Sequence, residues 1–432
     1  MAPELIGIIG IAVLLVCLAS GLWIGFSMAL VGFFGIIALR GVTQALNVVG
    51  SVPFSTINSY NMTVVPMFLL MGLVISETNI GVGLYRAANS WLGSFRGGLA
   101  TATTMASGLL GAICSSHMTG TIIMSKIALP EMRKYKYDDG LACGSIAGAA
   151  PLSIIIPPSM PFIMYGIITE QSVGKLFMAG VIPGIILMLT YVIIISFVTR
   201  RNPKLGPAGE KTSMKEKFSA ILDILPMLLL FGLVFGGIYG GFFTTTESGA
   251  IGALGAIVIA FASRQLTFKK LRKCIVDTAI ITSTILVLLT GTYIFISFIT
   301  LSKFPFLMAS QVQGLNAPDL VIIAAIAGIY IILGMFLPDM PMIVLTIPIL
   351  YPIITALGFD PIWFGMFVVL MQAVGSVSPP VGMVVYLLSG LSKVQINTIF
   401  KGVLPFIVGM VFVIILVVLF PPLSTFLPSL MK

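Results

Sequence analysis

Long apolar runs separated by short polar segments are the feature that most limits how this chain can fold. The first run, Leu5 to Leu39, contains no charged residue. A helix of roughly 20 apolar residues crosses a bilayer, so this run predicts two spans joined by a turn near Ser20-Gly21, not a signal peptide. With 58% hydrophobic and 9% charged residues and a mean hydropathy of +1.14, a soluble fold is excluded. We expect an all-α polytopic membrane protein with roughly ten or more spans, since a β-barrel would show short alternating strands.

The positive charges point to a membrane orientation and not to nucleic acid. The net charge is +9, and the basic residues lie in short blocks between apolar runs, at Arg200, Arg201, Lys204, Lys211, Lys215 and Lys217 and at Arg264, Lys269, Lys270, Arg272 and Lys273. Two expected spans, 221–240 and 247–262, separate these blocks, which places both in the cytoplasm. The four cysteines form no CxxC pair and there is one histidine, which argues against a disulfide framework, a zinc site or an iron–sulfur cluster.

An internal repeat appears when Pro157-Pro158 is aligned with Pro379-Pro380, an offset of 222 residues. Without gaps this offset also matches four flanking positions: Pro130 with Pro352, Asp138 with Asp360, Gly180 with Gly402, and Pro183 with Pro405. Repeat one ends in a basic block and repeat two in a charge-poor segment, which favours inverted repeats. We therefore divide the chain into N-terminal scaffold helices (1–60), repeat one (61–199), cytoplasmic basic loops with scaffold helices (200–300) and repeat two (301–432).

Each Pro-Pro pair interrupts apolar sequence, where proline removes a backbone donor and leaves upstream carbonyls without partners. An ordinary proline kink would explain one such pair, but two at matching repeat positions favour oxygen ligands for a desolvated Na⁺. Before each pair lies a second interruption, at 111–120 and 333–339, which we interpret as re-entrant hairpin tips.

The hairpin tips carry the candidate anion-binding groups. Hydroxyls and helix-end amides there suit a carboxylate or a sulfonate, although the serines could also serve close helix packing. An acid at membrane depth, Asp339, is costly and usually functional, with helix capping beside Pro338 as the alternative. The lone His117 is either a proton carrier or a polar packing residue.

An ordered set of segments resembles the large permease subunit of tripartite ATP-independent periplasmic (TRAP) transporters. In the first half these segments are Pro66 to Gly72, Gly97 to Ala100, Pro130 to Met132, Ile156 to Ser159, Tyr165-Gly166 and Leu176 to Gly184. In the second half they are Phe243 to Glu247, which is similar to the family's FTPTE element, Asp339, Gly358 to Pro361 and Ser378 to Gly382. The resemblance implies a Na⁺-driven importer of a small organic anion in a bacterial or archaeal inner membrane.

That resemblance also implies an elevator-type fold with paired re-entrant hairpins, and two protein partners. These are a four-span small membrane subunit and a periplasmic substrate-binding protein, all working in membrane lipid. The first Na⁺ site would use Gly111, Cys114, Ser153, Ile156 and Pro157, and the second Gly334, Gly375, Ser378 and Val381. The substrate would lie near Ser115, Ser116, His117 and Asp339.

Two departures from the family pattern concern the site. The tip reads Cys114-Ser115-Ser116-His117 where the family has Ser-Gly-Ser-Ser, so C4-dicarboxylates, sugar acids and small sulfonates all stay open; Ser378 stands where threonine is usual. An intramembrane enzyme using Ser115, His117 and an aspartate is the rival function, and it would require these groups in hydrogen-bond contact. A channel is the other rival, but it leaves two matched broken helices unexplained.

Overall fold

A computed structural model describes residues 2–114, 116–314 and 318–431, without the side chains of 112–114. The described residues form helices connected by turns and short loops, with no strand among them, which confirms the expected all-α polytopic fold. Among these residues, eight helical stretches are long and apolar enough to cross a membrane, with 139–169 counted as one. Roughly ten or more were expected from apolar length alone. The difference arises because the first two helices have 17 residues each and because other apolar runs are broken or bent.

The N-terminal helices pack on one long helix from the middle of the chain. They are α1 (Pro3–Ala19), α2 (Ile24–Arg40), α3 (Val42–Ile57) and the 3₁₀ turn η1 (Tyr60–Thr63), and the turn after α1 falls at Ser20-Gly21 as predicted. Helix α14 (Phe268–Leu301) lies along α2. The contact needs small residues, because a Cβ added at Gly32 would lie 2.9 Å from the carbonyl carbon of Ile294.

Two helical hairpins occupy the predicted positions, and each is followed by a broken helix. The first hairpin is α6 (Gly98–Cys114) with α7 (His117–Lys134), followed by α8 (Asp139–Ala149), α9 (Leu152–Ile155) and α10 (Met160–Thr169). The second is α16 (Asp319–Phe336) with α17 (Asp339–Ala356), followed by α18 (Pro361–Val377) and α19 (Met383–Ser392). The offset of 222 residues carries α7 onto α17 at both ends.

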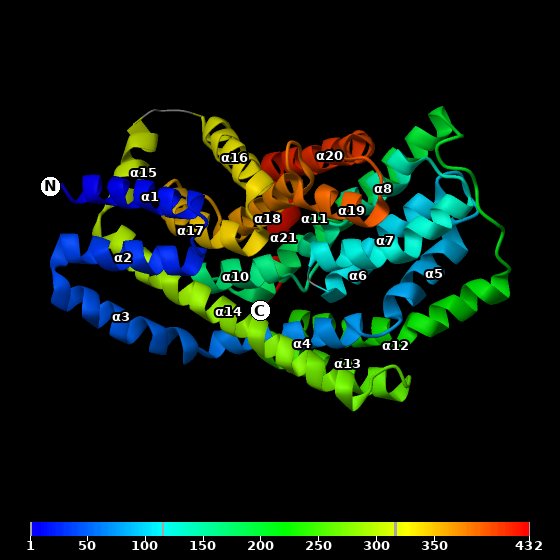
Figure 1. The fold of residues 1–432 in the computed structure, drawn as a ribbon, viewed down its shortest axis with the longest axis horizontal. Helices are drawn as coiled ribbons and strands as arrows, with labels where there is room; N and C mark the ends of the chain where they lie inside the picture. Colours follow the sequence, from blue (N-terminus) through cyan, green and yellow to red (C-terminus); the bar gives the residue numbers. More distant parts are fainter. Residues whose placement is uncertain (1, 115, 315–317, 432) are drawn as a thin grey trace.

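The repeats are related by reciprocal contacts. Helix α10 of repeat one packs on α17, while α19 of repeat two packs on α7; similarly, α8 packs on α20 and α18 on α11. Such exchange of partners is what a two-fold relation requires. Figure 1 shows α6 and α7 on one side of the centre and α16 and α17 on the other, so the hairpins enter from opposite ends of the molecule.

The broken helices form the interior of the protein. Every residue of α18 from Ile362 to Val377 is buried, and so is every residue of α8 from Gly140 to Ala149. A helix enclosed on all sides has no polar face, which is why neither segment shows amphipathic periodicity. Pro151 separates α8 from the short α9.

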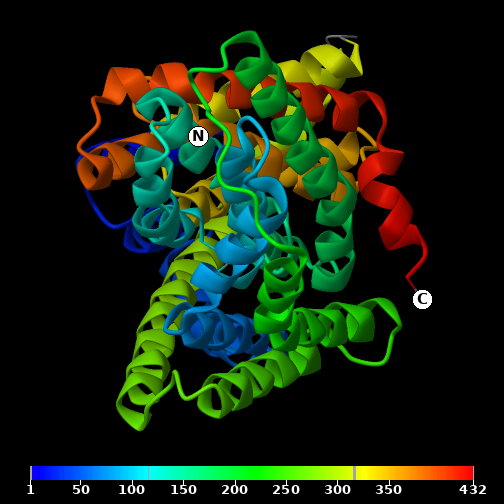
Figure 2. The ribbon, with the colours of Figure 1, turned by 90° about the vertical axis from the view of Figure 1, so that its right-hand side faces the viewer.

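The remaining helices surround this interior: α4 (Val64–Ser76), α5 (Ile80–Leu92), α11 (Val173–Arg201), α12 (Met214–Tyr239), α13 (Thr245–Ala262), α15 (Phe304–Gly314), α20 (Ile396–Leu419) and α21 (Pro422–Ser429). In Figure 2, α13 and the first part of α14 project away from the main helix cluster. Large apolar side chains such as Phe34, Ile193 and Ile332 are exposed, as expected for lipid-facing surfaces.

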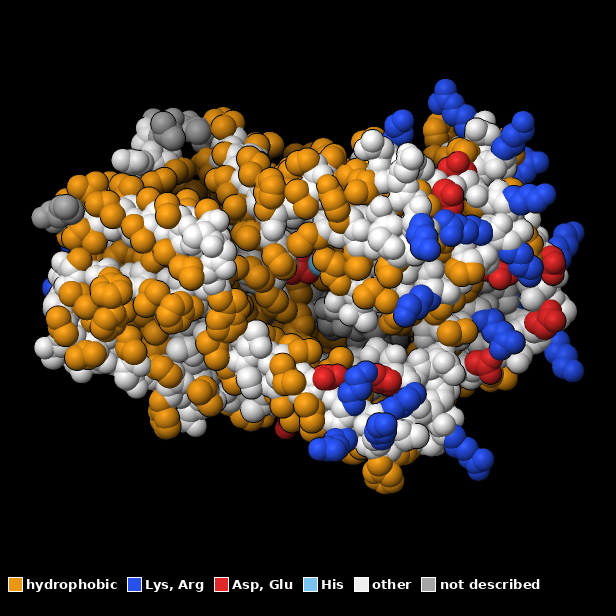
Figure 3. All heavy atoms as spheres, viewed as in Figure 1, with side chains coloured by type: hydrophobic (Ala, Val, Ile, Leu, Met, Phe, Trp, Pro, Cys, Tyr) orange, Lys and Arg blue, Asp and Glu red, His pale blue; other side chains and the backbone are white. Residues whose placement is uncertain are grey.

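Charge is segregated along the molecule. Figure 3 shows the Lys and Arg side chains gathered at one end of the face in view, while the other end is largely hydrophobic. Helices α12 and α13 match the two spans predicted between the basic blocks. One basic end is the arrangement that the positive-inside rule associates with the cytoplasm.

Candidate functional site

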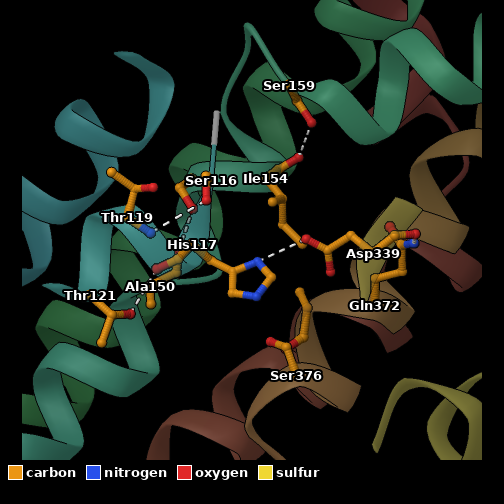
Figure 4. Close-up of polar contacts among 12 residues, drawn as sticks. Ser116, His117, Thr119, Thr121, Ala150, Ile154, Ser159, Asp339, Gln372 and Ser376 are labelled. Carbon is orange, nitrogen blue, oxygen red and sulfur yellow. Dashed lines mark hydrogen bonds and ion pairs between the residues drawn. The ribbon is translucent and has the colours of Figure 1, made fainter. Parts of the chain in front are cut away.

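The two hairpin tips meet at His117 and Asp339. His117 is the first residue of α7 and Asp339 the first residue of α17, and the 222-residue offset places them at equivalent positions of the two repeats. His117 Nδ1 lies 2.8 Å from Asp339 Oδ2, with side-chain exposures of 5% and 16%. Figure 4 shows the imidazole and the carboxylate pointing toward each other from separate helices. The structure thus brings two predicted site residues into close contact in a largely buried position, where they form an ion pair when His117 is protonated.

Both residues are held by local structure. Ser116 caps α7, because its hydroxyl accepts a hydrogen bond from the Thr119 amide at 3.3 Å. At the other tip, Gln372 Nε2 of α18 donates to the main-chain carbonyl of Asp339 at 2.8 Å. Gln372 is buried, so this bond fixes the start of α17 against the second broken helix.

Three residues that link helices, Gln372, Tyr330 and Thr346, were missed by reasoning from sequence. Gln372 stands alone as a polar residue in the apolar stretch 362–374, which is the signal that could have identified it. Tyr330 and Thr346 join α16 to α17 through a buried hydroxyl–hydroxyl hydrogen bond of 2.8 Å. Tyrosine and threonine are common in membrane helices, so only the packing of α16 on α17 reveals the hydrogen bond between Tyr330 and Thr346.

A cavity of about 540 Å³ lies at the tips. Its lining comes from both tips, from the start of α10 and from α2, α4 and α14, and it includes Ser116, His117, Thr119, Ser76, Thr284 and Asp339. Among the described residues of this lining, His117 and Asp339 are the only ionisable side chains, and none is Lys or Arg. In the space-filling view the face is hollowed near its middle (Figure 3).

The predicted first Na⁺ site lies where α6 meets the first helix break. Gly111 packs directly against the backbone of Ser153, leaving no room for a Cβ. Because Pro157 and Pro158 lack N–H groups, the carbonyls of Ser153 and Ile154 lose their helical donors. The Ile154 carbonyl instead accepts a hydrogen bond from the Ser159 hydroxyl. In the described part of the chain, no group donates a hydrogen bond to the Ser153 carbonyl. Ile156 ends α9.

Two of the predicted site residues, Cys114 and Ser115, are not fully covered by the part of the chain that the structure describes. Ser115 lies outside the described residues, as does the side chain of Cys114. Their assignments to the substrate and to the first Na⁺ site therefore stay predictions.

The predicted second Na⁺ site has a similar break, except that the Gly375 carbonyl accepts the Ser378 amide at 3.3 Å. Gly334 of α16 and Gly375 of α18 are in backbone contact, and a Cβ added at Gly375 would lie 2.6 Å from the Gly334 Cα. Gly375 stands four residues before Pro379, as Ser153 stands four before Pro157. Ser378 is the C-cap residue that follows α18, and its hydroxyl donates to the Val374 carbonyl at 2.7 Å. The lone pairs of the hydroxyl oxygen can therefore still face a cation. No hydrogen bond among the described residues joins Val381, the fourth residue of this predicted site, to Gly334, Gly375 or Ser378.

The donor chemistry at both breaks fits a hard monovalent cation. It consists of main-chain carbonyls and the Ser378 hydroxyl, the oxygen ligands that such ions prefer. Within the described ranges, no cluster of three or more His, Cys, Asp or Glu side chains could hold a metal ion.

A catalytic triad would need a hydroxyl on the second imidazole nitrogen. His117 Nε2 is buried and has no hydrogen-bond partner among the described residues. The rival enzyme hypothesis needs a nucleophile, a histidine and an aspartate in contact. His117 and Asp339 are in contact, but no described hydroxyl is hydrogen-bonded to the histidine.

The segment Phe243 to Glu247 has a clear structural role. The Glu247 carboxylate accepts hydrogen bonds from the Thr244 amide at 2.7 Å and from its hydroxyl at 2.9 Å, while the Glu247 amide donates to the Thr244 hydroxyl. This is a capping box at the start of α13.

Comparison with solved structures places the fold among membrane transporters. The YdaH transporter of Alcanivorax borkumensis superposes with a TM-score of 0.61 at 13% identity, covering 88% of this chain and 90% of that one. MtrF of Neisseria gonorrhoeae, described as illuminating a class of antimetabolite efflux pumps, superposes with a TM-score of 0.59 at 14% identity, covering 96% and 94%. At these identities the likeness concerns the fold alone.

Sequence relatives are closer. An isethionate TRAP transporter permease protein of Oleidesulfovibrio alaskensis is 30% identical over 98% of this chain and 70% of its own length. A sialic acid TRAP transporter large permease protein of Vibrio cholerae is 27% identical over 96% of both chains. A C4-dicarboxylate TRAP transporter large permease protein of Pseudomonas aeruginosa is 30% identical over 87% of this chain and 88% of its own.

The family model for the DctM component of the tripartite ATP-independent periplasmic transporter matches residues 11–423. That match spans both hairpins, both broken helices and the cavity between the tips. The chain therefore belongs to the DctM family of TRAP transporter large permeases, as its sequence motifs predicted.

Proposed function

We propose that this chain is the large membrane subunit of a Na⁺-coupled importer that carries a small organic anion across a bacterial or archaeal inner membrane. The observation that carries the proposal is the meeting of the two hairpin tips at a 540 Å³ cavity lined by His117, Asp339 and serine and threonine side chains. The relatives are named for isethionate, sialic acid and C4-dicarboxylates. All three are organic acids, which supports an organic anion as the substrate.

Na⁺ coupling rests on the chemistry of the two helix breaks. The Ser153 and Gly375 carbonyls lie at equivalent positions, and proline removes the amide four residues later that would bond to each in a continuous helix. The Gly375 carbonyl accepts the Ser378 amide at 3.3 Å and keeps a second lone pair for a cation. We propose that these two carbonyls, with Gly111, Cys114, Ile156 and Pro157 in one half and Gly334, Ser378 and Val381 in the other, provide the oxygen ligands for Na⁺. The bound ion would supply positive charge beside the cavity, where the anion needs it.

An elevator mechanism is supported by the position of the cavity. One wall consists of the hairpin tips and α10, and the opposite wall of α2, α4 and α14. Movement of the hairpins and broken helices along α2 and α14 would carry the cavity from one side of the membrane to the other. A four-span small subunit and a periplasmic binding protein would complete the transporter.

The test is uptake into proteoliposomes that contain this chain and its small-subunit partner, with a loaded binding protein outside. Uptake should require an inward Na⁺ gradient and should be lost when K⁺ replaces Na⁺. Equal uptake in K⁺, or uptake without any binding protein, would contradict the proposed coupling.

A further inference from the structure

We infer that a phospholipid with a primary ammonium headgroup, phosphatidylethanolamine, binds in a pocket between α8, α11 and α20 at the basic end of the molecule. The pocket has a volume of about 320 Å³, and its lining shares no residue with that of the cavity at the hairpin tips. Asp138, just before α8, the end of α11, Leu205 and the first half of α20 form the lining. The inference is independent of the transported anion and goes beyond the proposed function.

The basic residues around this pocket mark it as cytoplasmic. Arg200 and Arg201 end α11, and Leu205 lies in the basic loop that follows. The Leu205 carbonyl accepts a hydrogen bond from the Asp138 amide at 3.0 Å, so this loop closes one side of the pocket. Because the positive-inside rule assigns such loops to the cytoplasm, the pocket lies where the headgroups of the cytoplasmic leaflet meet water.

The lining changes from polar to apolar with depth in the membrane. Thr398 and Lys401 lie near the start of α20, and Phe406 follows them. A helical rise of about 1.5 Å per residue places Phe406 about 7 Å below Lys401 along the axis. On α11, which ends at the same surface, Ile194 lies one turn below Val198. A molecule with a polar head above an apolar tail matches this gradient.

The deep end of the pocket adjoins surfaces that face lipid. Ile193 and Phe197 of α11, and Leu404 and Val408 of α20, are each more than half exposed. Large apolar side chains with such exposure, on helices long enough to cross the membrane, contact acyl chains and not water. A soluble phosphate compound would leave the apolar wall uncovered, whereas a phospholipid can lay its acyl chains along it.

One acid and one base line the pocket without forming an ion pair with each other. Asp138 Oδ1 accepts the Leu141 amide at 3.1 Å and caps α8, while its second oxygen accepts no hydrogen bond from a described residue. Lys401 is exposed and forms no ion pair within the described ranges. Phosphatidylethanolamine carries the matching groups, because its ammonium can donate to Asp138 while its phosphate accepts from Lys401 and Thr398.

Asp138 distinguishes phosphatidylethanolamine from other common phospholipids. The quaternary ammonium of phosphatidylcholine has no N–H to donate, and phosphatidylglycerol brings a negative charge to the carboxylate without a cation. Arg200, Arg201 and Lys204 are exposed outside the lining and attract any phosphate at the surface. They therefore add affinity for phospholipid without choosing between the two zwitterionic headgroups.

The experiment compares lipids that differ only in the headgroup. The complex of this chain with its small subunit is washed in detergent to remove bound lipid, and thermal unfolding is followed as one lipid is added back. The probes are the dioleoyl forms of phosphatidylethanolamine, phosphatidylcholine and phosphatidylglycerol, and glycerophosphoethanolamine, which has the headgroup without acyl chains. The apparent Kd of phosphatidylethanolamine should be about tenfold lower than that of phosphatidylcholine, because one charge-assisted hydrogen bond separates them. Glycerophosphoethanolamine should leave the melting temperature unchanged.

Variants of the two charged residues locate the site. Asp138→Asn keeps a helix cap but loses the charge, so phosphatidylethanolamine should bind within about threefold of phosphatidylcholine. Lys401→Gln should weaken the binding of both lipids, because both use the phosphate. The matched controls are Asp139→Asn, whose carboxylate pairs with Arg133 at 3.2 Å, and Lys393→Gln; neither residue lines the pocket, and both variants should keep the preference. If Asp138→Asn does not fold, Asp138→Ser supplies another cap.

Four results would overturn the inference. Phosphatidylcholine could bind the unmodified complex as tightly as phosphatidylethanolamine, or phosphatidylglycerol could bind more tightly, which would assign the selection to the basic residues. Glycerophosphoethanolamine could stabilise the complex as well as the lipid does, which would make the pocket a site for a soluble phosphate. A folded Asp138 variant could keep the preference, which would move the lipid elsewhere. Each readout is lipid binding, so a failure of Na⁺-coupled uptake would leave the inference standing.

Discussion

At the scale of single residues, the repeat places two different ionisable groups at one symmetric position. His117 and Asp339 are equivalent in the two repeats, and both begin the second helix of a hairpin. Two aspartates or two protonated histidines at 2.8 Å would repel each other, whereas one of each attract. The departure from sequence symmetry therefore lets the two tips approach.

Ser378 tests the second Na⁺ site. Ser378→Ala removes one oxygen ligand while α18 keeps its backbone, and we expect the half-saturating Na⁺ concentration for uptake to rise about tenfold, equivalent to ~1.4 kcal/mol. The matched control is Ser125→Ala on α7, because that buried hydroxyl also donates to a carbonyl of its own helix. Unchanged Na⁺ activation in Ser378→Ala would remove this residue from the site.

Gln372 tests the support of Asp339. Gln372→Met retains the length of the side chain but loses the donor to the Asp339 carbonyl, and it should raise the KM for the anion several-fold. Thr346→Val breaks the hydrogen bond with Tyr330 elsewhere in the second hairpin. That control should lower the melting temperature, at a cost of about 1 kcal/mol, with little effect on KM. Equal KM values for both variants would show that Gln372 has only a packing role.

At the scale of elements, each hairpin touches its broken helix through glycine. Gly111 meets Ser153 in repeat one and Gly334 meets Gly375 in repeat two, close to the helix break in each case. The contacts bring together segments that carry the proposed Na⁺ ligands. Close backbone packing therefore couples hairpin position to ion binding in both halves.

Glycine substitutions test this coupling. A Cβ in Gly375→Ala would meet the Gly334 backbone at 2.6 Å, and such overpacking typically costs about 1–3 kcal/mol. We expect a lower melting temperature and a strongly reduced uptake rate. Gly328→Ala in α16 is the control, because nothing lies within 4 Å of its added Cβ. Wild-type uptake and stability in Gly375→Ala would contradict the observed packing.

The capping box of α13 gives a second test at this scale. Glu247→Ala removes the carboxylate that accepts both hydrogen bonds from Thr244 and should destabilise the protein by about 1 kcal/mol, seen in thermal unfolding. Glu247→Gln can still accept those bonds and should restore most of the stability. If the glutamine variant instead lost transport at normal stability, the charge would have a role beyond capping.

At the scale of the whole molecule, the inverted repeats predict opposite exposure of equivalent positions. Lys134 ends α7 and Ala356 ends α17, the two positions are 222 residues apart, and both side chains are exposed. The Asp138 amide, shortly after α7, donates a hydrogen bond to the Leu205 carbonyl in the basic loop after α11. Because that loop is expected in the cytoplasm, the end of α7 should face the cytoplasm as well. The end of α17 should then face the periplasm.

Single cysteines at these two positions test the topology. In a background without the four native cysteines, an impermeant maleimide should label Lys134→Cys only in inside-out vesicles and Ala356→Cys only in right-side-out vesicles. A detergent-solubilised sample, in which both sites must react, is the control. Labelling of both cysteines from one side would exclude the inverted arrangement.

Local pattern was sufficient for most of the architecture. Apolar runs predicted the membrane helices because a bilayer accepts little else, and the turn at Ser20-Gly21 and the spans α12 and α13 followed from charge and length. The proline pairs located both helix breaks, since proline removes the backbone donor wherever it stands. The sequence motifs shared with the family predicted that the chain is a TRAP large permease.

Only the tertiary structure decided which of these parts touch. The offset related His117 to Asp339, but equivalence in a repeat does not require contact; their meeting depends on two hairpins that enter from opposite ends. Gln372, Tyr330 and Thr346 carry no signal that names their partners, because a hydrogen bond across helices depends on packing between segments far apart in the chain. Sequence therefore determined the elements and their chemistry, while packing determined which side chains line the cavity together.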